Sequence, residues 1–132
     1  MILILIVIFL ILLNKVTVML FSKKFLTEAS NYPIYSQDDK KLEAVVLCRL
    51  TLSVPDVYTA YLLEYDPDND VFFGLARLHN CIDYLEYGYI SKNELESLND
   101  QYGICIDSEV PAFKTTLKEC FLKYPEDHLL NS

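Results

Sequence analysis

The residues of this 132-residue chain that could bind a metal ion lie in two short segments. In the first, Asp66, Asp68 and Asp70 alternate as carboxylates do at the start of a calcium-binding loop. The sixth position of such a loop requires glycine but is Val71 here, and the twelfth requires a bidentate glutamate but is Arg77. The segment therefore favours a structural hairpin turn, because Asp and Asn side chains bond their own backbone in turns.

The second segment holds His79 and Cys81, two possible zinc ligands that are two positions apart. A zinc site needs a second pair of ligands, and the only other histidine is His128, near the C-terminus. We therefore expect no metal and no cofactor. No pair of cysteines has Cys-x-x-Cys spacing, so we also expect four reduced thiols in a reducing compartment. They are Cys48, Cys81, Cys105 and Cys120.

Carboxylates could also serve a metal-dependent hydrolase. Glu64 and Glu86 fall on expected strands and could converge on one metal ion, although solvent-facing strand positions explain them more simply. Glu94 and Glu96 are further candidates on an expected helix. The sequence contains no glycine-rich phosphate loop and no nucleophile in a recognisable setting. We therefore expect no catalytic residues and favour a non-enzymatic accessory or protein-interaction domain, with a carboxylate–metal hydrolase as an alternative.

The net charge of −8 bears on the kind of partner. Direct binding to DNA or RNA needs a surface of Lys and Arg, so none is expected. A basic protein partner fits an acidic domain better, and the charge also favours solubility. A second alternative is an acidic inhibitor that imitates the charge of DNA, such as an antirestriction factor of a mobile element.

The N-terminus is apolar without a break from Ile2 to Leu13, and mostly apolar as far as Phe21. A helix over this length could span a membrane despite Lys15, and it would hold the domain on the cytoplasmic or stromal side. The alternative is that the protein starts at Met19 and resides in the cytoplasm or an organelle stroma. The abundance of Ile, Leu, Lys, Asn and Tyr hints at an AT-rich genome, such as that of an organelle or a low-GC bacterium.

Apolar periodicity predicts the elements that would position these residues. Strands are expected at 42–52, 57–65, 71–78, 85–90 and 103–106, and helices at 22–29, 92–98 and 116–122. Ser91 and Glu94 have the spacing of a capping box at the second helix. The pattern indicates an α+β fold, with a small, mostly antiparallel sheet and short helices on one face. The expected organisation is an apolar segment at 1–18, one domain at 19–124 and a loose tail at 125–132.

Four blocks of sequence carry a resemblance to a known family. They are 20–26 with 32–36, 41–50, 64–67 with 72–75, and 86–91 with 94–97. Together they resemble the family catalogued as domain of unknown function 2958, small bacterial proteins often encoded on plasmids and other mobile elements. The resemblance covers about residues 20–120, begins close to Met19, and weakens at 76–85 and 99–111. It implies a fold and a genomic habit, but no activity. Its signature residues are Tyr65, Asp66, Pro67, Phe72, Phe73, Gly74, Gly88, Tyr89, Ser91, Glu94 and Leu95.

Overall fold

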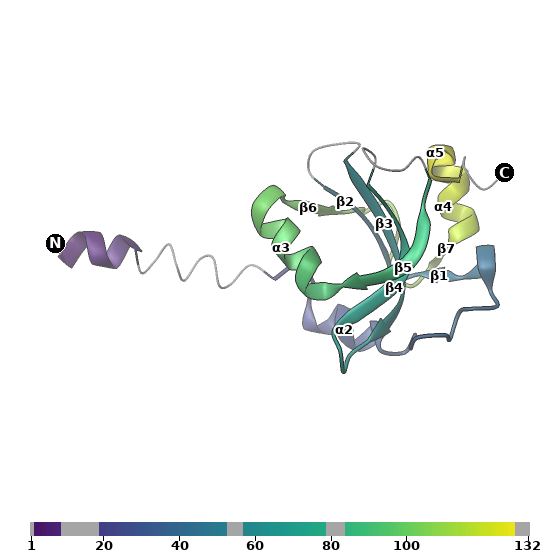
Figure 1. Cartoon of the computed structure of the whole chain (residues 1–132), viewed down its shortest axis with the longest axis horizontal. Helices are drawn as coiled ribbons and strands as arrows, with labels where there is room; N and C mark the ends of the chain where they lie inside the picture. The colour runs from purple at the N-terminus through teal and green to yellow at the C-terminus, as the bar shows by residue number, and fades with distance from the viewer. Residues whose placement is uncertain (1, 9–18, 53–56, 79–83, 129–132) are drawn as a thin grey trace.

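A computed structural model describes residues 2–8, 19–52, 57–78 and 84–128, and it confirms the α+β fold (Figure 1). The described strands are β1 (Val45–Val46), β2 (Cys48–Leu52), β3 (Tyr58–Asp66), β4 (Val71–Leu78), β5 (Glu86–Ser91), β6 (Ile104–Ile106) and β7 (Thr115–Thr116). The helices after the N-terminal segment are α2 (Lys23–Ala29), the 3-10 helix η1 (Lys41–Glu43), α3 (Lys92–Tyr102), α4 (Leu117–Lys123) and α5 (Pro125–His128).

The main sheet has five strands in the order β5-β4-β3-β2-β6, and every neighbouring pair is antiparallel. The hairpin between β3 and β4 closes through the predicted Asx turn. The carboxylate of Asp66 accepts the N–H of Asp68 at 2.9 Å, and the hydroxyl of Tyr65 donates to Asp70 at 2.7 Å. These bonds give the acidic turn a structural role of its own.

A bulge in β3 changes the register of this hairpin. Leu62 pairs with Gly74, whereas Glu64 pairs with Phe73, so Leu63 is the extra residue. Gly74 fits this place because it has no side chain: a Cβ there would lie 1.9 Å from the carbonyl oxygen of Tyr61. The two backbones approach too closely for any other residue.

Helices cover both faces of the sheet, not one as expected. On the first face, Phe21 and residues of α2 and α3 pack on Leu50, Leu62 and Phe72 in one apolar cluster. On the second face, α4 packs on the other set of strand side chains, among them Tyr61 and Leu75. Figure 1 shows α2 and α3 at one side of the domain and α4 and α5 at the other. Successive side chains of a strand point to opposite faces, so the same strands contribute residues to both clusters.

The single strand expected at 42–52 is divided. Residues 41–43 form η1, β1 pairs with β7 in a small separate sheet, and only β2 joins the main sheet. Lys41 has a φ of 52°, in the left-handed region that extended strands do not use. The chain therefore turns before it enters the sheet.

The expectation of a single-pass membrane protein is wrong. Within the described residues, no helix has both the length and the hydropathy needed to cross a membrane. Residues 2–8 are helical, with Ile2 exposed, and Leu13 lies outside the described residues. Phe21, the expected end of the span, is instead 1% exposed and packs against Phe25 and Phe72 in the core.

The segment expected to be a loose tail contributes a buried charge. Residues 125–128 form α5, while 129–132 lie outside the described residues. The carboxylate of Asp127 lies 3.1 Å from the Arg49 guanidinium and 3.0 Å from that of Arg77, and its side chain is 1% exposed. The Tyr61 hydroxyl also donates to it. One acidic side chain thus joins three strands, β2, β3 and β4, to the C-terminal helix.

A second carboxylate extends this network. Asp107 lies 3.1 Å from Arg49 and accepts a hydrogen bond from the hydroxyl of Tyr124, whose ring lies under the Arg49 guanidinium. Burial alone would raise the pKa of Asp107, but the bonds from Tyr124 and the Glu109 N–H and the charge of Arg49 outweigh it. The pKa of Asp107 is therefore lowered. Burial, with the bond to Asp107, raises the pKa of Tyr124 to about 12.

Candidate functional site

Four aromatic side chains form an exposed surface on the second face of the sheet. We call Tyr35, Phe73, Tyr87 and Tyr89 the aromatic face. The three tyrosines are 70%, 59% and 60% exposed, in chain order. The Phe73 ring stacks on Tyr87, with centroids 6.0 Å apart, and meets Tyr89 edge-on at 5.3 Å. These contacts fix the rings relative to one another while leaving much of their area to solvent.

The strands dictate this arrangement. Phe73 on β4 stands opposite Tyr89 on β5, and Tyr87 is two positions from Tyr89, so all three side chains emerge on one face. Further along the same face, Leu75 is 3% exposed in the cluster that contains α4. The helix therefore covers one part of this face and leaves the aromatic part open.

Glu64 ties the fourth aromatic residue to the sheet. This carboxylate is 2% exposed and accepts the backbone N–H of Tyr35 at 3.0 Å and that of Gln37 at 2.7 Å. Tyr35 has a φ of 76°, a left-handed conformation that is costly for a tyrosine. The two bonds hold the loop in that conformation, which places Tyr35 beside Tyr89. A hydrogen bond joins the side chains of these two tyrosines.

Gln37 fastens the same loop to the sheet a second time. Its amide nitrogen donates to the carbonyl oxygens of Leu63 at 2.6 Å and Val45 at 2.9 Å. Its amide oxygen accepts the Val45 N–H at 2.6 Å. The side chain is 6% exposed, so these bonds are sheltered from water. The loop is a fixed wall of the site, built by the two buried side chains of Gln37 and Glu64.

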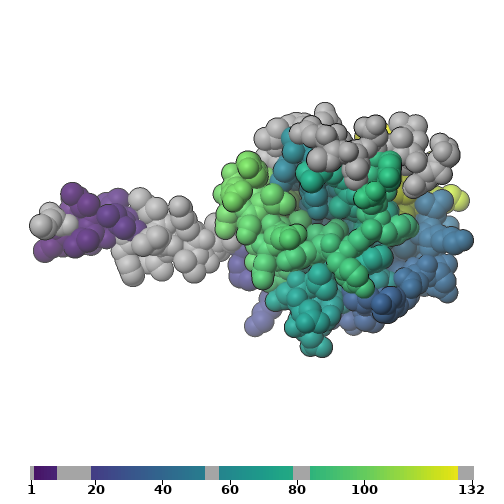
Figure 2. All heavy atoms as spheres, in the orientation of Figure 1, coloured from purple at the N-terminus to yellow at the C-terminus, as the bar shows by residue number. Residues whose placement is uncertain are grey.

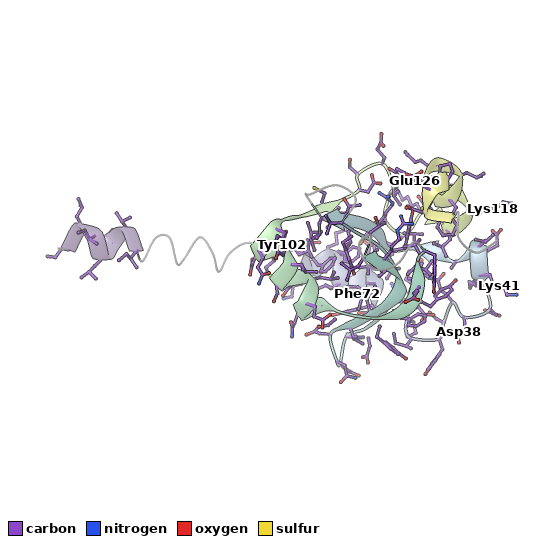
Figure 3. All side chains as sticks on the ribbon, turned by 45° about the horizontal axis from the view of Figure 1, so that its top comes forward. Asp38, Lys41, Phe72, Tyr102, Lys118 and Glu126 are labelled. Carbon is purple, nitrogen blue, oxygen red and sulfur yellow. The ribbon has the colours of Figure 1, made fainter. Side chains whose placement is uncertain are left out.

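A pocket of about 320 Å³ lies between this loop and the aromatic face. In Figure 2 the blue atoms of the loop adjoin the green atoms of β5, and in Figure 3 Asp38 and Lys41 lie at the same end of the domain. The volume suits one large side chain or a small ligand. Its lining residues are Gln37, Asp38, Lys41, Ala44, Leu63, Glu64, Phe73 and Tyr87.

The electrostatic setting of the pocket is mildly acidic. Asp38 and Glu64 contribute two carboxylates to its lining and Lys41 one cation. The pKa of Tyr89 is raised, first by its hydrogen bond with Tyr35 and also by the negative charges of Glu64 and Asp38. Burial raises the pKa of Tyr87. Both tyrosines therefore stay neutral at physiological pH, and their rings keep the electron-rich faces that attract cations.

Two of the carboxylates considered for hydrolysis, Glu64 and Glu86, have structural partners. Both oxygens of Glu64 accept loop N–H groups, and Glu86 forms a hydrogen bond with Tyr84. No group of three or more His, Cys, Asp and Glu within the described ranges is placed to hold a metal ion. The two possible zinc ligands, His79 and Cys81, lie outside those ranges, as does the side chain of His128.

The signature residues separate into five groups. Tyr65, Phe72 and Leu95 are core residues, and Asp66 and Pro67 belong to the hairpin turn. Ser91 caps α3 by accepting the N–H of Glu94 at 3.3 Å, but only this half of the predicted capping box forms. The complete capping box belongs to Thr116 and Glu119 at α4. Gly74 and Gly88 are paired on β4 and β5, and Phe73 and Tyr89 belong to the aromatic face.

The sequence alone did not reveal Tyr35 and Tyr87 as members of a site. Tyr35 and Tyr87 are 52 positions apart in the chain. Only the conformation of the loop and the pairing of the strands bring them to the same surface. Their individual contacts, one with Tyr89 and one with Phe73, appear once the sheet is formed. Alternation of tyrosines at 87 and 89 was the only available signal of a shared face.

Burial keeps two of the described cysteines unreactive. Cys48, Cys105 and Cys120 form no disulfide within the described residues. Burial raises the pKa of Cys48 to about 12 and that of Cys120 to about 11, so both remain protonated at neutral pH.

Comparisons of this chain with protein-family models, with curated proteins and with solved structures find no match.

Proposed function

We propose that the chain is a non-enzymatic protein-interaction domain that binds a basic segment of a protein partner on its aromatic face. The observation that carries this proposal is a fixed surface of three exposed tyrosines around the half-buried ring of Phe73, beside an acidic pocket. Tyr and Phe in such a surface supply large contact area at a small cost in conformational entropy. Isolated exposed aromatic residues would carry no such argument.

The chemistry of the surface favours Arg and Lys side chains. Stacked aromatic rings attract a cation by about 0.5–1 kcal/mol at exposed sites. The carboxylates of Asp38 and Glu64 add attraction at the pocket, and the net charge of −8 attracts a basic partner from a distance. An acidic or phosphate-bearing partner would be repelled by the same charges. The proposal therefore excludes direct nucleic-acid binding as the main role.

The resemblance to the family of domain of unknown function 2958 remains part of this proposal. The fold agrees with the α+β expectation, and the signature residues include Phe73 and Tyr89 of the aromatic face. We therefore propose that the aromatic face is shared by members of that family, which would be accessory proteins of mobile elements.

Selection from a displayed library of random peptides tests the proposal. The wild-type chain should enrich peptides rich in Arg and Lys, and a variant carrying Tyr87→Ser and Tyr89→Ser should not. Both substitutions leave the net charge unchanged, so the comparison separates the aromatic face from general acidity. Enrichment of the same basic peptides by both proteins, or of acidic peptides by the wild type, would refute the proposal.

A further inference from the structure

The strand that carries two of the aromatic residues lies at an open edge of the sheet. β5 pairs with β4 and, among the described strands, with no other. Its register with β4 runs without a break from Glu86 to Ser91. Natural edge strands are usually protected by lysine, proline, a bulge or short length, because free backbone groups there can pair with another chain. β5 has six residues, without lysine, proline or a bulge, and its one charged residue is Glu86 at its start.

The other edge of the same sheet differs. β6 has only three residues, Ile104–Ile106, which is one of the ordinary ways to blunt an edge. The two edges therefore offer unequal templates for strand pairing, and β5 is the more suitable.

The residues along β5 suit an added strand. Tyr87 and Tyr89 lie two positions apart, so their spacing of about 6.8 Å matches that of alternate side chains on an incoming strand. Gly88 lies between them, and a Cβ there would meet no atom within 4 Å. The space beside Gly88 is therefore open on the opposite face of the strand.

We propose that an extended basic segment of a protein partner adds to β5 as a sixth strand, with Arg or Lys at alternate positions over Tyr87 and Tyr89. This inference rests on the proposed function and specifies how the segment binds. Backbone hydrogen bonds along β5 supply affinity, and the alternate side chains supply specificity. Glu86 lies at the start of β5, and Asp38 and Glu64 lie in the adjoining pocket, which completes the charge complementarity.

A second copy of this chain is a poorer occupant of the same edge. Two chains of net charge −8 repel each other, and pairing β5 with β5 would place identical acidic surfaces side by side. The charge therefore selects a basic segment over self-association. Sedimentation of the full chain should show a monomer, and a dimer that dissociates on substitution of Gly88→Lys would overturn the choice of occupant.

Four synthetic peptides test the binding mode. The first alternates Arg and Val over seven residues. Two further peptides have the same sequence with N-methyl groups on one or the other set of alternate backbone amides, and the fourth has Glu in place of Arg. N-methylation removes hydrogen-bond donors from one edge of the peptide without changing its charge. Titrations of the full chain with each peptide give the affinities.

We expect the Arg peptide to bind, and one N-methylated form and the Glu peptide to bind at least about tenfold more weakly. Equal binding of the Arg peptide and both N-methylated forms would overturn strand addition but leave the proposed function standing. Equal binding of the Arg peptide to the wild type and to the Tyr87→Ser, Tyr89→Ser variant would overturn the proposed function itself. Absence of binding at about 1 mM would overturn both.

Discussion

The two paired glycines of β4 and β5 should respond in opposite ways to the same substitution. In Gly74→Ala the new Cβ would lie 1.9 Å from the carbonyl oxygen of Tyr61 and 3.2 Å from the Cα of Leu62. All of the nearby atoms belong to backbone, so no side chain can move aside. Relaxed carbon–oxygen contacts begin at about 3.3 Å, so the hairpin would have to open by more than about 1 Å beside the β3 bulge.

The free-energy cost of that movement is the sum of two contributions. Overpacking a tight site costs about 1–3 kcal/mol, and a disturbed ladder hydrogen bond adds about 1 kcal/mol. We therefore expect Gly74→Ala to lower the free energy of unfolding by about 2–4 kcal/mol. Gly88→Ala meets no atom within 4 Å and has no positive φ to strain, so it should raise the free energy of unfolding by about 0.4–1 kcal/mol.

Urea unfolding followed by circular dichroism measures both changes. Small domains have slopes of about 1–3 kcal/mol per molar urea, so Gly74→Ala should lower the midpoint by about 1 M or more. Gly88→Ala is the matched control, since the two glycines face each other in register. Equal destabilisation by both substitutions, or an unchanged midpoint for Gly74→Ala, would refute the assigned hairpin register.

Three further predictions concern buried carboxylates. Asp127→Asn removes the negative charge between Arg49 and Arg77, so the free energy of unfolding should fall by about 3–5 kcal/mol, and an unchanged urea midpoint would contradict the buried network. Glu64→Ala releases the loop amides, so hydrogen exchange should accelerate at residues 35 and 37 but not in α3; unchanged protection at both amides would count against the clamp. The pKa of Asp107 is lowered in the folded state, so its ionised carboxylate raises the free energy of unfolding. This contribution is complete above about pH 4 and is lost as the pH falls through the folded pKa. The difference in urea midpoint between the wild type and Asp107→Asn should therefore shrink from pH 6 to pH 3, and a difference that stays constant would refute this role.

The strands and helix starts were predictable because local signals determine them. The range 71–78 was predicted with the boundaries of β4, and the Asp66 turn forms through bonds within the turn itself. Ser91 caps α3 as its position indicated. The division of 42–52 was missed, because the turn at Lys41 depends on a left-handed conformation that lysine shows no preference for.

The long-range features could not be predicted from one sequence. Asp127 and Arg49 are 78 positions apart, and nothing local to the C-terminus indicated that α5 would bury a carboxylate. The aromatic face depends on which part of the sheet α4 leaves uncovered, and that is a property of packing. Phe73 and Tyr89 were recognised as signature residues, but their exposure could not be assigned before the layers were known.

Mapping the bound basic peptide on the chain would test the central claim most directly. Amide chemical shifts of the isotope-labelled protein, recorded while the alternating Arg–Val peptide is added, report which residues are affected. We predict progressive shifts at Tyr35, Phe73, Tyr87 and Tyr89, with α2 and α3 unchanged. Shifts confined to other surfaces, or no shifts at a peptide concentration of about 1 mM, would contradict it.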